Sequence, residues 1–375
     1  MVLGRRIAVG TTDQKGRTEM RELHDGRQDG LVPLESLDVR SANSFAEMLQ
    51  AMSKTAFGGR ALGEALGVLH AMDEDPDCAI VVTISGAMTI AKMGRVLCDM
   101  IEADLAQIVI STGAIMAHGL SEAIGGLHYK HEPHISDRQL YEWGYNRVYD
   151  TIETEENLCE NEAVMRQVLD GLDWSRPTCS HRITRAIGQY LLDHDQMPSI
   201  LGWACRKDVP VYVPAFTDSE LGLDLATYAL GRHRAEHGPD ADLFAAAPPP
   251  FNPFLDLFDY ARRIAGVRTL GIVTIGGGVP RNWAQQIGPY FDLMQMRVGS
   301  ELPVPRFKYG VRICPEPVHW GGLSGCTYTE GVSWGKFVSP ADGGRFAEVY
   351  CDATIAWPLL VRAALESRDD CPREA

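Results

Sequence analysis

The sequence predicts an α/β fold with a mostly parallel, doubly wound sheet in a single large domain. Short apolar and β-branched runs alternate with stretches of helical periodicity. The runs are apolar on both faces, which is typical of parallel strands covered by helices on both sides. Each run ends in small or polar residues. Because the carboxyl ends of such strands form the ligand-binding crevice, the same pattern predicts where a site would lie.

Five runs have the length and composition of strands. They are residues 79–84, 107–113, 209–215, 269–275 and 346–350. A helix is expected after the first run, because Met93, Leu97 and Met100 recur at helical spacing.

Two segments interrupt this alternation. The Pro-rich segment 245–254 is expected to form an exposed loop within the domain, since proline stiffens the chain and removes a backbone donor. Residues 1–43 are polar and lack clear periodicity, so we expect an N-terminal extension that is mobile over residues 13–30. The folded domain is expected over residues 44–375.

Composition excludes several classes of protein. No apolar run approaches the roughly 18 residues of a membrane span, and the N-terminus lacks the apolar core of a secretory signal. The nine cysteines are scattered and never spaced C-x-x-C, which indicates reduced thiols in a cytoplasmic protein. The net charge of −15 disfavours nucleic acid as a partner and is compatible with a small cationic substrate.

Lys336 is the candidate nucleophile. It ends a Gly-rich loop, with Trp334 on one side, Phe337 on the other and Glu330 nearby. Apolar neighbours would desolvate the lysine and disfavour its ammonium form. A neutral lysine amine can form an imine with a carbonyl or iminium carbon. The alternative is an ordinary surface lysine whose stem packs along the tryptophan.

The strand ends supply a candidate nucleotide site. Gly276, Gly277 and Gly278 follow a predicted strand and would let the backbone approach a phosphate or ribose, or would form a tight strand-to-helix turn. The G-x-G-x-x-G fingerprint is absent. Asp218 and Asp352 each follow a strand, where a carboxylate binds ribose hydroxyls or caps the next helix.

Histidines provide two further candidates. The run 128–134 contains three histidines and a glutamate at a spacing found in metal sites. Because a proline in the run prevents a continuous helix, a polar loop is favoured and no metal is expected. His118 follows the strand end at Thr112 and is expected close to the crevice.

Together these motifs resemble the deoxyhypusine synthase family. The matching segments are 55–60, 214–218, 276–279, 332–336 and 352–361, in one consistent order between about residues 44 and 365. The resemblance implies a Rossmann-like fold, NAD as cofactor, and a homotetramer with active sites between subunits. Lys336 matches the catalytic lysine of the family.

The resemblance also implies the reaction. In the family, NAD takes a hydride from the carbon beside the secondary amine of spermidine. Diaminopropane leaves, and the aminobutyl group passes through an imine on the lysine to an acceptor amine. The chain therefore looks like an NAD-dependent aminobutyl (aminoalkyl) transferase acting on polyamines such as spermidine and putrescine, with homospermidine a candidate product. The alternatives are authentic deoxyhypusine synthase, which modifies a lysine of a partner protein, and a non-catalytic NAD- or polyamine-binding protein.

The sequence departs from the family's pattern around the substrate. Asn282 occupies the position of the catalytic histidine of the eukaryotic enzyme, and His118 that of a glutamate in an acidic motif. Trp320 and Leu323 stand where the family has two aspartates. These departures resemble the bacterial deoxyhypusine synthase-like branch, and they predict a changed donor or acceptor pocket.

Matching residue by residue predicts three groups of site residues. The catalytic residues are Lys336, His118 and Asn282. The substrate-binding residues are Glu330, Trp334, Leu323 and Asp224. Glu330 and Trp334 are the same as in the family, and Asp224 lies beside the position of a family aspartate. The cofactor-binding residues are Ser85, Thr112, Gly113, Asp218, Gly276, Gly277, Gly278, Ser324, Asp352 and Ala353.

Overall fold

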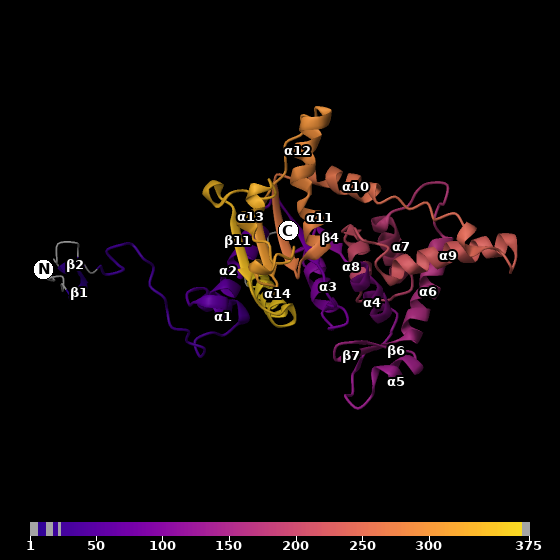
Figure 1. The fold of residues 1–375 in the computed structure, drawn as a ribbon, viewed down its shortest axis with the longest axis horizontal. Helices are drawn as coiled ribbons and strands as arrows, with labels where there is room; N and C mark the ends of the chain where they lie inside the picture. Colours follow the sequence, from indigo (N-terminus) through magenta and orange to yellow (C-terminus); the bar gives the residue numbers. More distant parts are fainter. Residues whose placement is uncertain (1–6, 13–17, 22–23, 370–375) are drawn as a thin grey trace.

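A parallel six-stranded sheet with helices on both faces forms the centre of the molecule (Figure 1). The computed structural model describes residues 7–12, 18–21 and 24–369. In sheet order the strands are β11 (Arg345–Val349), β10 (Phe307–Ile313), β9 (Thr269–Ile275), β3 (Cys78–Ile84), β4 (Ile108–Ser111) and β8 (Val211–Tyr212). Every neighbouring pair in this sheet is parallel. The predicted α/β class is confirmed.

The strand order reverses at the centre of the sheet. The chain builds β3, β4 and β8 toward one edge, then returns to the other side of β3 and builds β9, β10 and β11 toward the opposite edge. This is the doubly wound, Rossmann-like order, whose ligand crevice lies at the point of reversal. Ile84 and Ile275 are paired at the ends of β3 and β9, so the residues that follow them leave the sheet side by side.

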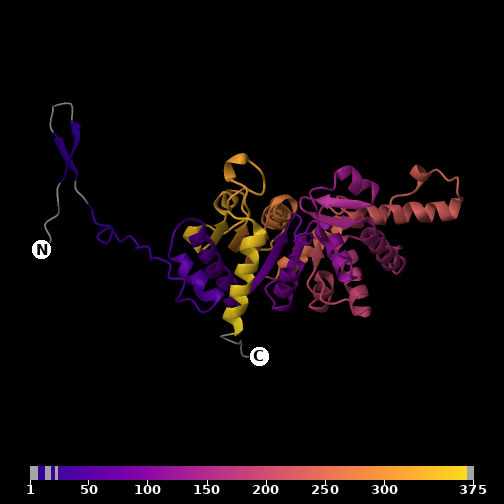
Figure 2. The same ribbon diagram turned by 90° about the horizontal axis from the view of Figure 1, so that it is seen from below.

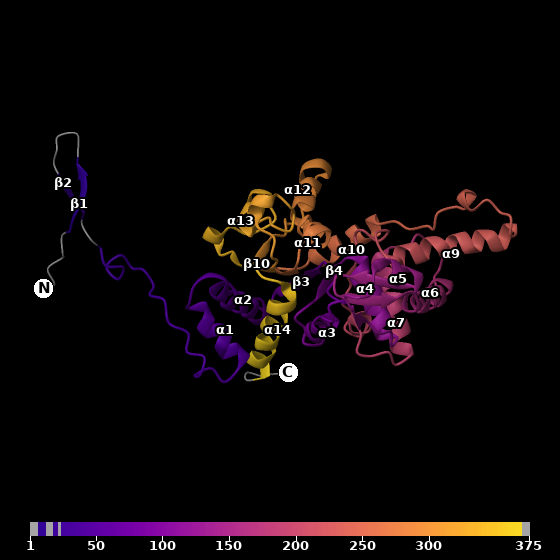
Figure 3. The ribbon, with the colours of Figure 1, turned by 60° about the horizontal axis from the view of Figure 1, so that its bottom comes forward.

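The two faces of the sheet have separate apolar cores because successive strand residues point to opposite sides. Ile80 and Val82 of β3 pack into one core, and Val81 packs into the other. The first core is covered by α1 (Phe45–Ser53), α2 (Phe57–Glu74), α3 (Gly94–Glu102), α4 (Gly113–Ala123) and α14 (Ala353–Asp369). The second is covered by α10 (Phe254–Ile264), α11 (Gly278–Gln285), α12 (Ile287–Val298) and α13 (Tyr328–Ser333). Figure 3 shows α11, α12 and α13 on the side of the sheet opposite α1, α2 and α14.

The remaining elements extend beyond the β8 edge of the sheet. They are α5 (Asp137–Glu142), α6 (Glu155–Asp170), α7 (Ser180–Asp193), α8 (Ile200–Arg206) and α9 (Glu220–His237). A small antiparallel sheet of β5 (Tyr129–Lys130), β7 (Thr151–Thr154) and β6 (Tyr145–Val148) lies beside them. Short 3-10 turns occur at Leu243–Ala245, Val318–Trp320 and Pro340–Asp342. No helix among the described residues is long and apolar enough to cross a membrane.

The N-terminal residues lie apart from this body. Figure 2 shows the hairpin of β1 (Ile7–Thr12) and β2 (Thr18–Arg21) separated from the sheet by an extended segment that leads to α1. The boundary expected near residue 44 stays a prediction, although α1 begins at Phe45. Part of the segment expected to be mobile, residues 13–17 and 22–23, lies outside the described residues.

The sequence pattern located five of the six central strands and missed β10. That strand carries Lys308 and Arg312 among its apolar residues, and the charges broke the apolar run by which the other strands were recognised. The strands after residues 107 and 209 are also shorter than expected. The Pro-rich segment 245–254 is largely exposed, as predicted, except that α10 already begins at Phe254.

Candidate active site

A cavity of about 360 Å³ surrounds Lys336. Four other residues predicted for the site line it: Asn282 from α11, Leu323 from the loop before α13, Glu330 from α13, and Trp334 just after that helix. Trp334 is 64 % exposed and stands at the rim, whereas Lys336 lies inside. The structure thus brings together residues spread over more than fifty positions of the chain.

Lys336 is buried and has a neutral partner. Its side chain is 9 % exposed, and Nζ donates a hydrogen bond to Asn282 Oδ1 at 3.0 Å. Burial lowers the pKa of Lys336 below its ordinary value, and the Arg281 guanidinium lowers it further, while Cys326 and Glu330 act in the opposite direction. Burial also raises the pKa of Cys326, so that thiol is uncharged at neutral pH. The lysine can therefore lose its proton more readily than an ordinary lysine.

The backbone around Lys336 is fixed on both sides. Its N–H donates to Gly331 O at 3.1 Å, and its carbonyl accepts from Phe307 N at 3.0 Å, where β10 begins. Gly335 has φ of +68°, and a Cβ there would lie 2.5 Å from Arg306 Nη1. Glycine is therefore required immediately before the lysine.

Two buried arginines anchor the loop that forms the other wall of the cavity. Arg281 Nη1 donates to Leu323 O at 3.0 Å, and its Nη2 donates to Cys326 O at 2.6 Å. Arg312 Nη1 donates to Ser324 O and, at 3.2 Å, to Cys326 O. Guanidinium donors held in a rigid fork suit a cluster of carbonyl acceptors. The conformation of this loop thus depends on residues of α11 and β10.

The triple glycine forms a tight turn at the point where the strand order reverses. Gly277 N–H donates to Ser85 Oγ at 2.8 Å. A Cβ at Gly276 would lie 2.5 Å from Ser85 Oγ, and one at Gly277 would lie 2.5 Å from Ser324 Cα. Two of the glycines are therefore explained by close packing between the turn, the end of β3 and the anchored loop. Gly278 has φ of +63° and no atom near its missing side chain.

The other predicted cofactor residues continue along the same carboxyl edge. Thr112 and Gly113 follow β4, and Asp218 follows β8. Thr112 Oγ1 is buried and has no hydrogen-bond partner among the described residues. An unpaired hydroxyl at a strand end fits a nucleotide oxygen, since buried polar atoms are otherwise costly.

Asp352 and Ala353 follow β11 at the other end of this row. From β11 to β8 the sheet has five strand intervals, or about 24 Å, so the predicted cofactor residues are spread along the edge rather than gathered in one cluster. Asp352 also caps α14, because its Oδ1 accepts the N–H of Thr354 at 2.7 Å. The capping alternative weighed for this residue is thus confirmed, and its ribose role stays a prediction.

Two of the predicted catalytic and substrate-binding residues do not line the Lys336 cavity. His118, on α4, is in contact with Glu153 of β7. Asp224, on α9, is 6 % exposed, and its Oδ2 has no hydrogen-bond partner among the described residues. Burial raises the pKa of Asp224 to about 7, and the nearby carboxylates Glu220 and Glu162 add to this effect.

The histidines of the run 128–134 lie in different environments. His131 Nε2 lies 3.1 Å from Ile135 O, and His134 is exposed, as expected for a polar loop. His128 differs, because its side chain is buried and its Nε2 lies 3.3 Å from Glu153 Oε2. The segment at His128 is a loop, as expected, but tertiary packing buries this one side chain beside Glu153.

Five cavity residues were missed from the sequence: Gln286, Val318, Gly321, Gly322 and Cys326. Gln286, which directly follows α11, lies one helical turn after Asn282 and lines the same cavity, so helical periodicity would have found it. Cys326 also lines the cavity, but nothing in its sequence surroundings distinguished it from the other cysteines.

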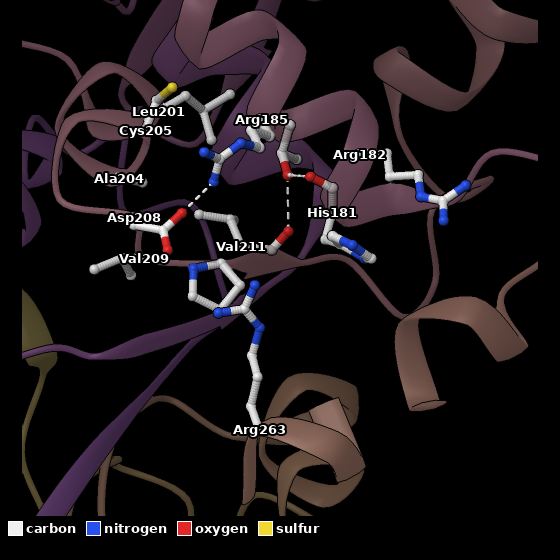
Figure 4. A pocket seen from close by; sticks show the side chains of 12 residues that line it. His181, Arg182, Arg185, Leu201, Ala204, Cys205, Asp208, Val209, Val211 and Arg263 are labelled. Carbon is white, nitrogen blue, oxygen red and sulfur yellow. Dashed lines mark hydrogen bonds and ion pairs between the residues drawn. The ribbon is translucent and has the colours of Figure 1, made fainter. Parts of the chain in front are cut away.

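A second cavity, of about 270 Å³, lies near the start of β8 (Figure 4). Two of its charged residues pair with each other, Arg185 with Asp208, and Thr184 Oγ1 donates to Val211 O at 2.8 Å. None of the predicted site residues lines it. It therefore offers less for chemistry than the cavity around Lys336.

The fold and the site together define a doubly wound α/β protein with small and polar residues at the strand ends and a buried lysine in a cavity. Residues 47–364 match the family model "Deoxyhypusine synthase". A Methanosarcina acetivorans protein named a probable deoxyhypusine synthase 2 is 30 % identical over 348 residues, 92 % of each chain. A deoxyhypusine synthase-like protein of Chlorobaculum tepidum is 29 % identical over 342 residues, 90 % of each chain. The chain belongs to the deoxyhypusine synthase family.

A solved structure shares the fold. A crystal structure from Entamoeba histolytica, assigned as a deoxyhypusine synthase, superposes with a TM-score of 0.54 and 14 % identity, covering 89 % of this chain and 97 % of the other. Members of the family transfer aminobutyl groups and use NAD as cofactor. The open hydroxyl of Thr112 and the glycine turn beside Ser85 fit that cofactor at the carboxyl edge of the sheet.

Proposed function

We propose that the protein is an NAD-dependent aminoalkyl transferase that moves an aminobutyl group between small polyamines through an imine on Lys336. The observation that carries the proposal is the buried lysine itself. Its pKa is lowered, its only polar partner at Nζ among the described residues is a neutral amide, and it faces a cavity of substrate size. A surface lysine would have none of these properties.

The residues of the cavity have different roles in such a transfer. Bound NAD supplies the oxidation that makes a carbon of the donor electrophilic and the reduction that completes the product. The neutral amine of Lys336 attacks that carbon and displaces diaminopropane, and the acceptor amine then displaces the lysine. Asn282 Oδ1 orients the Nζ protons without adding charge. Glu330 at the cavity wall is suited to an ammonium group of the polyamine.

Aspartates that the family resemblance implies are replaced in this chain. This replacement favours an amine substrate that differs from the family's ordinary donor or acceptor. Leu323 lines the cavity at a position where the family resemblance implies an aspartate. An ammonium group that loses a charged hydrogen-bond partner loses about 1.5–3 kcal/mol of binding free energy. A free diamine such as putrescine is therefore our proposed acceptor, and homospermidine our proposed product.

We further propose that the complete site forms between subunits of a homo-oligomer. His118 and Asp224 are absent from the lining of the Lys336 cavity of their own chain. Asp224 nevertheless has the character of an amine-binding residue, because it is a buried carboxylate whose Oδ2 lacks a partner among the described residues. A second copy would bring these groups to the lysine, as the family resemblance implies for a tetramer.

The test is an amine panel. The protein is incubated with NAD, spermidine and putrescine, and the products are identified by mass spectrometry, with agmatine and other di- and triamines in parallel. We expect diaminopropane and homospermidine. Formation of neither product from any amine pair would reject the proposal, and transfer of labelled aminobutyl only to a lysine of a protein acceptor would favour deoxyhypusine synthase itself.

Variants of Lys336 test the covalent step. Lys336→Ala and Lys336→Arg should both abolish product and any borohydride-trapped adduct, because neither alanine nor a protonated guanidinium forms an imine. NAD binding, measured by calorimetry, should remain nearly intact. Lys54→Arg, a substitution at an exposed lysine paired with Glu35, is the matched control. Full activity in Lys336→Arg would exclude covalent catalysis by this residue.

A further inference from the structure

We propose that Glu153 is a positioning residue that holds His118 with Nδ1 protonated, so that His118 Nε2 accepts a proton from an ammonium group of the substrate. The inference rests on the proposed function, because it concerns the proton that an amine must lose before it attacks the imine carbon. Glu153 belongs to none of the motifs discussed above.

A buried glutamate and two histidines from different segments converge at this point. Glu153 of β7 is 2 % exposed, and its Oε2 is in close contact with His118 Nδ1 and lies 3.3 Å from His128 Nε2. These three atoms have no hydrogen-bond partner of regular geometry among the described residues, and their close polar contacts are with one another. The second oxygen of Glu153 accepts a bond from Asn157 Nδ2 at 3.4 Å. The carboxylate is therefore oriented by its neighbours on both sides.

Glu153 remains a carboxylate at all ordinary pH values. Burial alone would raise its pKa, but hydrogen bonds from His118, His128 and Ser121 together hold the pKa well below its usual range. An ionised carboxylate only accepts hydrogen bonds. The nitrogen of His118 that faces it must therefore carry the proton.

Lys92 determines which ring nitrogen of His128 carries the proton. Its Nζ lies 2.6 Å from His128 Nδ1 and donates to Glu122 Oε1 at 2.7 Å. Because an ammonium group only donates, His128 Nδ1 is the acceptor, and the proton of a neutral His128 lies on Nε2, directed at Glu153. The charged and titratable groups around His118 are thus Glu153 and His128 in contact, with Lys92 and Glu122 behind them.

This arrangement decides against a metal ion. The ligand atoms of His118, His128 and Glu153 lie within 4.8 Å of one another, as they would around zinc. A metal needs the lone pair of each ring nitrogen, however, and Lys92 leaves His128 with a proton at the nitrogen that would have to bind. The cluster is better described as a carboxylate that receives a proton donor from each histidine.

The consequence is a histidine prepared for base catalysis. The His118 side chain is 24 % exposed although its Nδ1 is buried, so the exposed part of the ring is the side that carries Nε2. When a substrate ammonium binds there, its N–H bond breaks and the proton moves to Nε2. The freed electron pair of the amine then forms the bond to the carbon held by Lys336, and the imidazolium returns its proton to the departing amine. Glu153 stabilises the imidazolium in between.

The experiment combines a spectroscopic and a kinetic measurement on the full-length protein. In protein labelled with ¹⁵N-histidine, the signal of His118 is identified by its loss in His118→Gln, and its shifts report which nitrogen carries the proton. We expect the Nδ1–H form in the native protein. In Glu153→Gln the amide can donate to Nδ1, so the Nε2–H form should appear, with kcat reduced about 10²–10⁴-fold and KM nearly unchanged. Glu153→Asp, which retains the charge, should keep the Nδ1–H form and recover part of kcat.

The outcomes separate this inference from the proposed function. Glu155→Gln, at an exposed neighbouring carboxylate, is the control and should leave kcat unaltered. Three results would each overturn the inference. The first is an Nε2–H form of His118 in the native protein, and the second is an unchanged kcat in folded Glu153→Gln. The third is one bound divalent ion per chain that is lost in His128→Gln. Failure of every amine pair in the native protein would reject the proposed function, while the histidine signals would still show whether Glu153 holds His118 as described.

Discussion

At the scale of single residues, the pair of Lys336 and Asn282 sets the chemistry of the cavity. An amide oxygen at 3.0 Å from Nζ holds the lysine in place but adds no negative charge to stabilise its ammonium form. The lowered pKa of Lys336 therefore survives the contact. A carboxylate at the same position would act in the opposite sense, because an opposite charge within a few ångströms favours the charged form.

Asn282→Asp tests this balance. A lysine must be neutral to form an imine, so adduct formation should rise as pH rises through the pKa of Lys336. The aspartate should move the midpoint of that rise upward by about one unit or more. The measurement is borohydride-trapped adduct against pH. Asn252→Asp, in the loop before α10, is the control and should leave the midpoint in place; an unchanged or lower midpoint in Asn282→Asp would contradict the assignment.

At the scale of elements, the glycine turn and the anchored loop depend on each other. Gly277 packs against Ser324, and Ser324 is held through its carbonyl by Arg312. Arg312 also forms an ion pair with Glu348 of β11 at 2.7 Å. The turn after β9, the loop before α13 and the neighbouring strands thus form one connected unit on the cofactor side of the sheet.

Gly277→Ala should disturb this unit. The added Cβ would lie 2.5 Å from Ser324 Cα, so backbone atoms must move apart. If the predicted cofactor residues at this turn hold NAD, it should bind at least about tenfold more weakly, a loss of roughly 1.4 kcal/mol, as measured by calorimetry. Gly231→Ala in α9, where an added Cβ meets no atom within 4 Å, is the matched control. Equal NAD affinity in both variants would show that the turn lies outside the cofactor site.

The sequence predicted local features of these elements well and long-range partners poorly. The runs that became β3 and β9 are apolar on both faces, and that property is visible without a structure. Strand β10 escaped recognition because Arg312 is buried in it, and only tertiary contacts explain a buried guanidinium. The partners of His118 were hidden for the same reason, since Glu153 is contributed by a short strand of a small sheet that the pattern did not predict.

At the scale of the whole molecule, Asp224 links stability to pH. Its pKa is raised from 3.8 to about 7, so the folded protein holds a proton that the unfolded chain releases. Stability from this group is complete below pH 4 and is lost as pH rises to about 7 and above. Asp224→Asn should remove that loss: its melting temperature should exceed that of the native protein at pH 8 and approach it at pH 4.5. A native protein more stable than Asp224→Asn at pH 8 would contradict the prediction.

The same carboxylate is expected to respond to assembly and to ligand. If a polyamine ammonium meets Asp224 in a site between subunits, spermidine should raise the melting temperature at pH 8 more in the native protein than in Asp224→Asn. Sedimentation at micromolar concentration should then give a dimer or tetramer. A monomer would refute the proposed arrangement of the site.

The loop between β10 and α13 is held by its carbonyl oxygens, and this affects which of its residues can be substituted during evolution. Carbonyls are present whatever amino acid occupies a position, so a substitution at residue 323 or 324 leaves the contacts of Arg281 and Arg312 available. Selection can therefore alter side chains that face the amine substrate while the backbone of this loop keeps its conformation. Leu323, at a position where the family resemblance implies an aspartate, is an instance of such freedom, and mutational tolerance should be greater at residue 323 than at the two arginines that hold the loop.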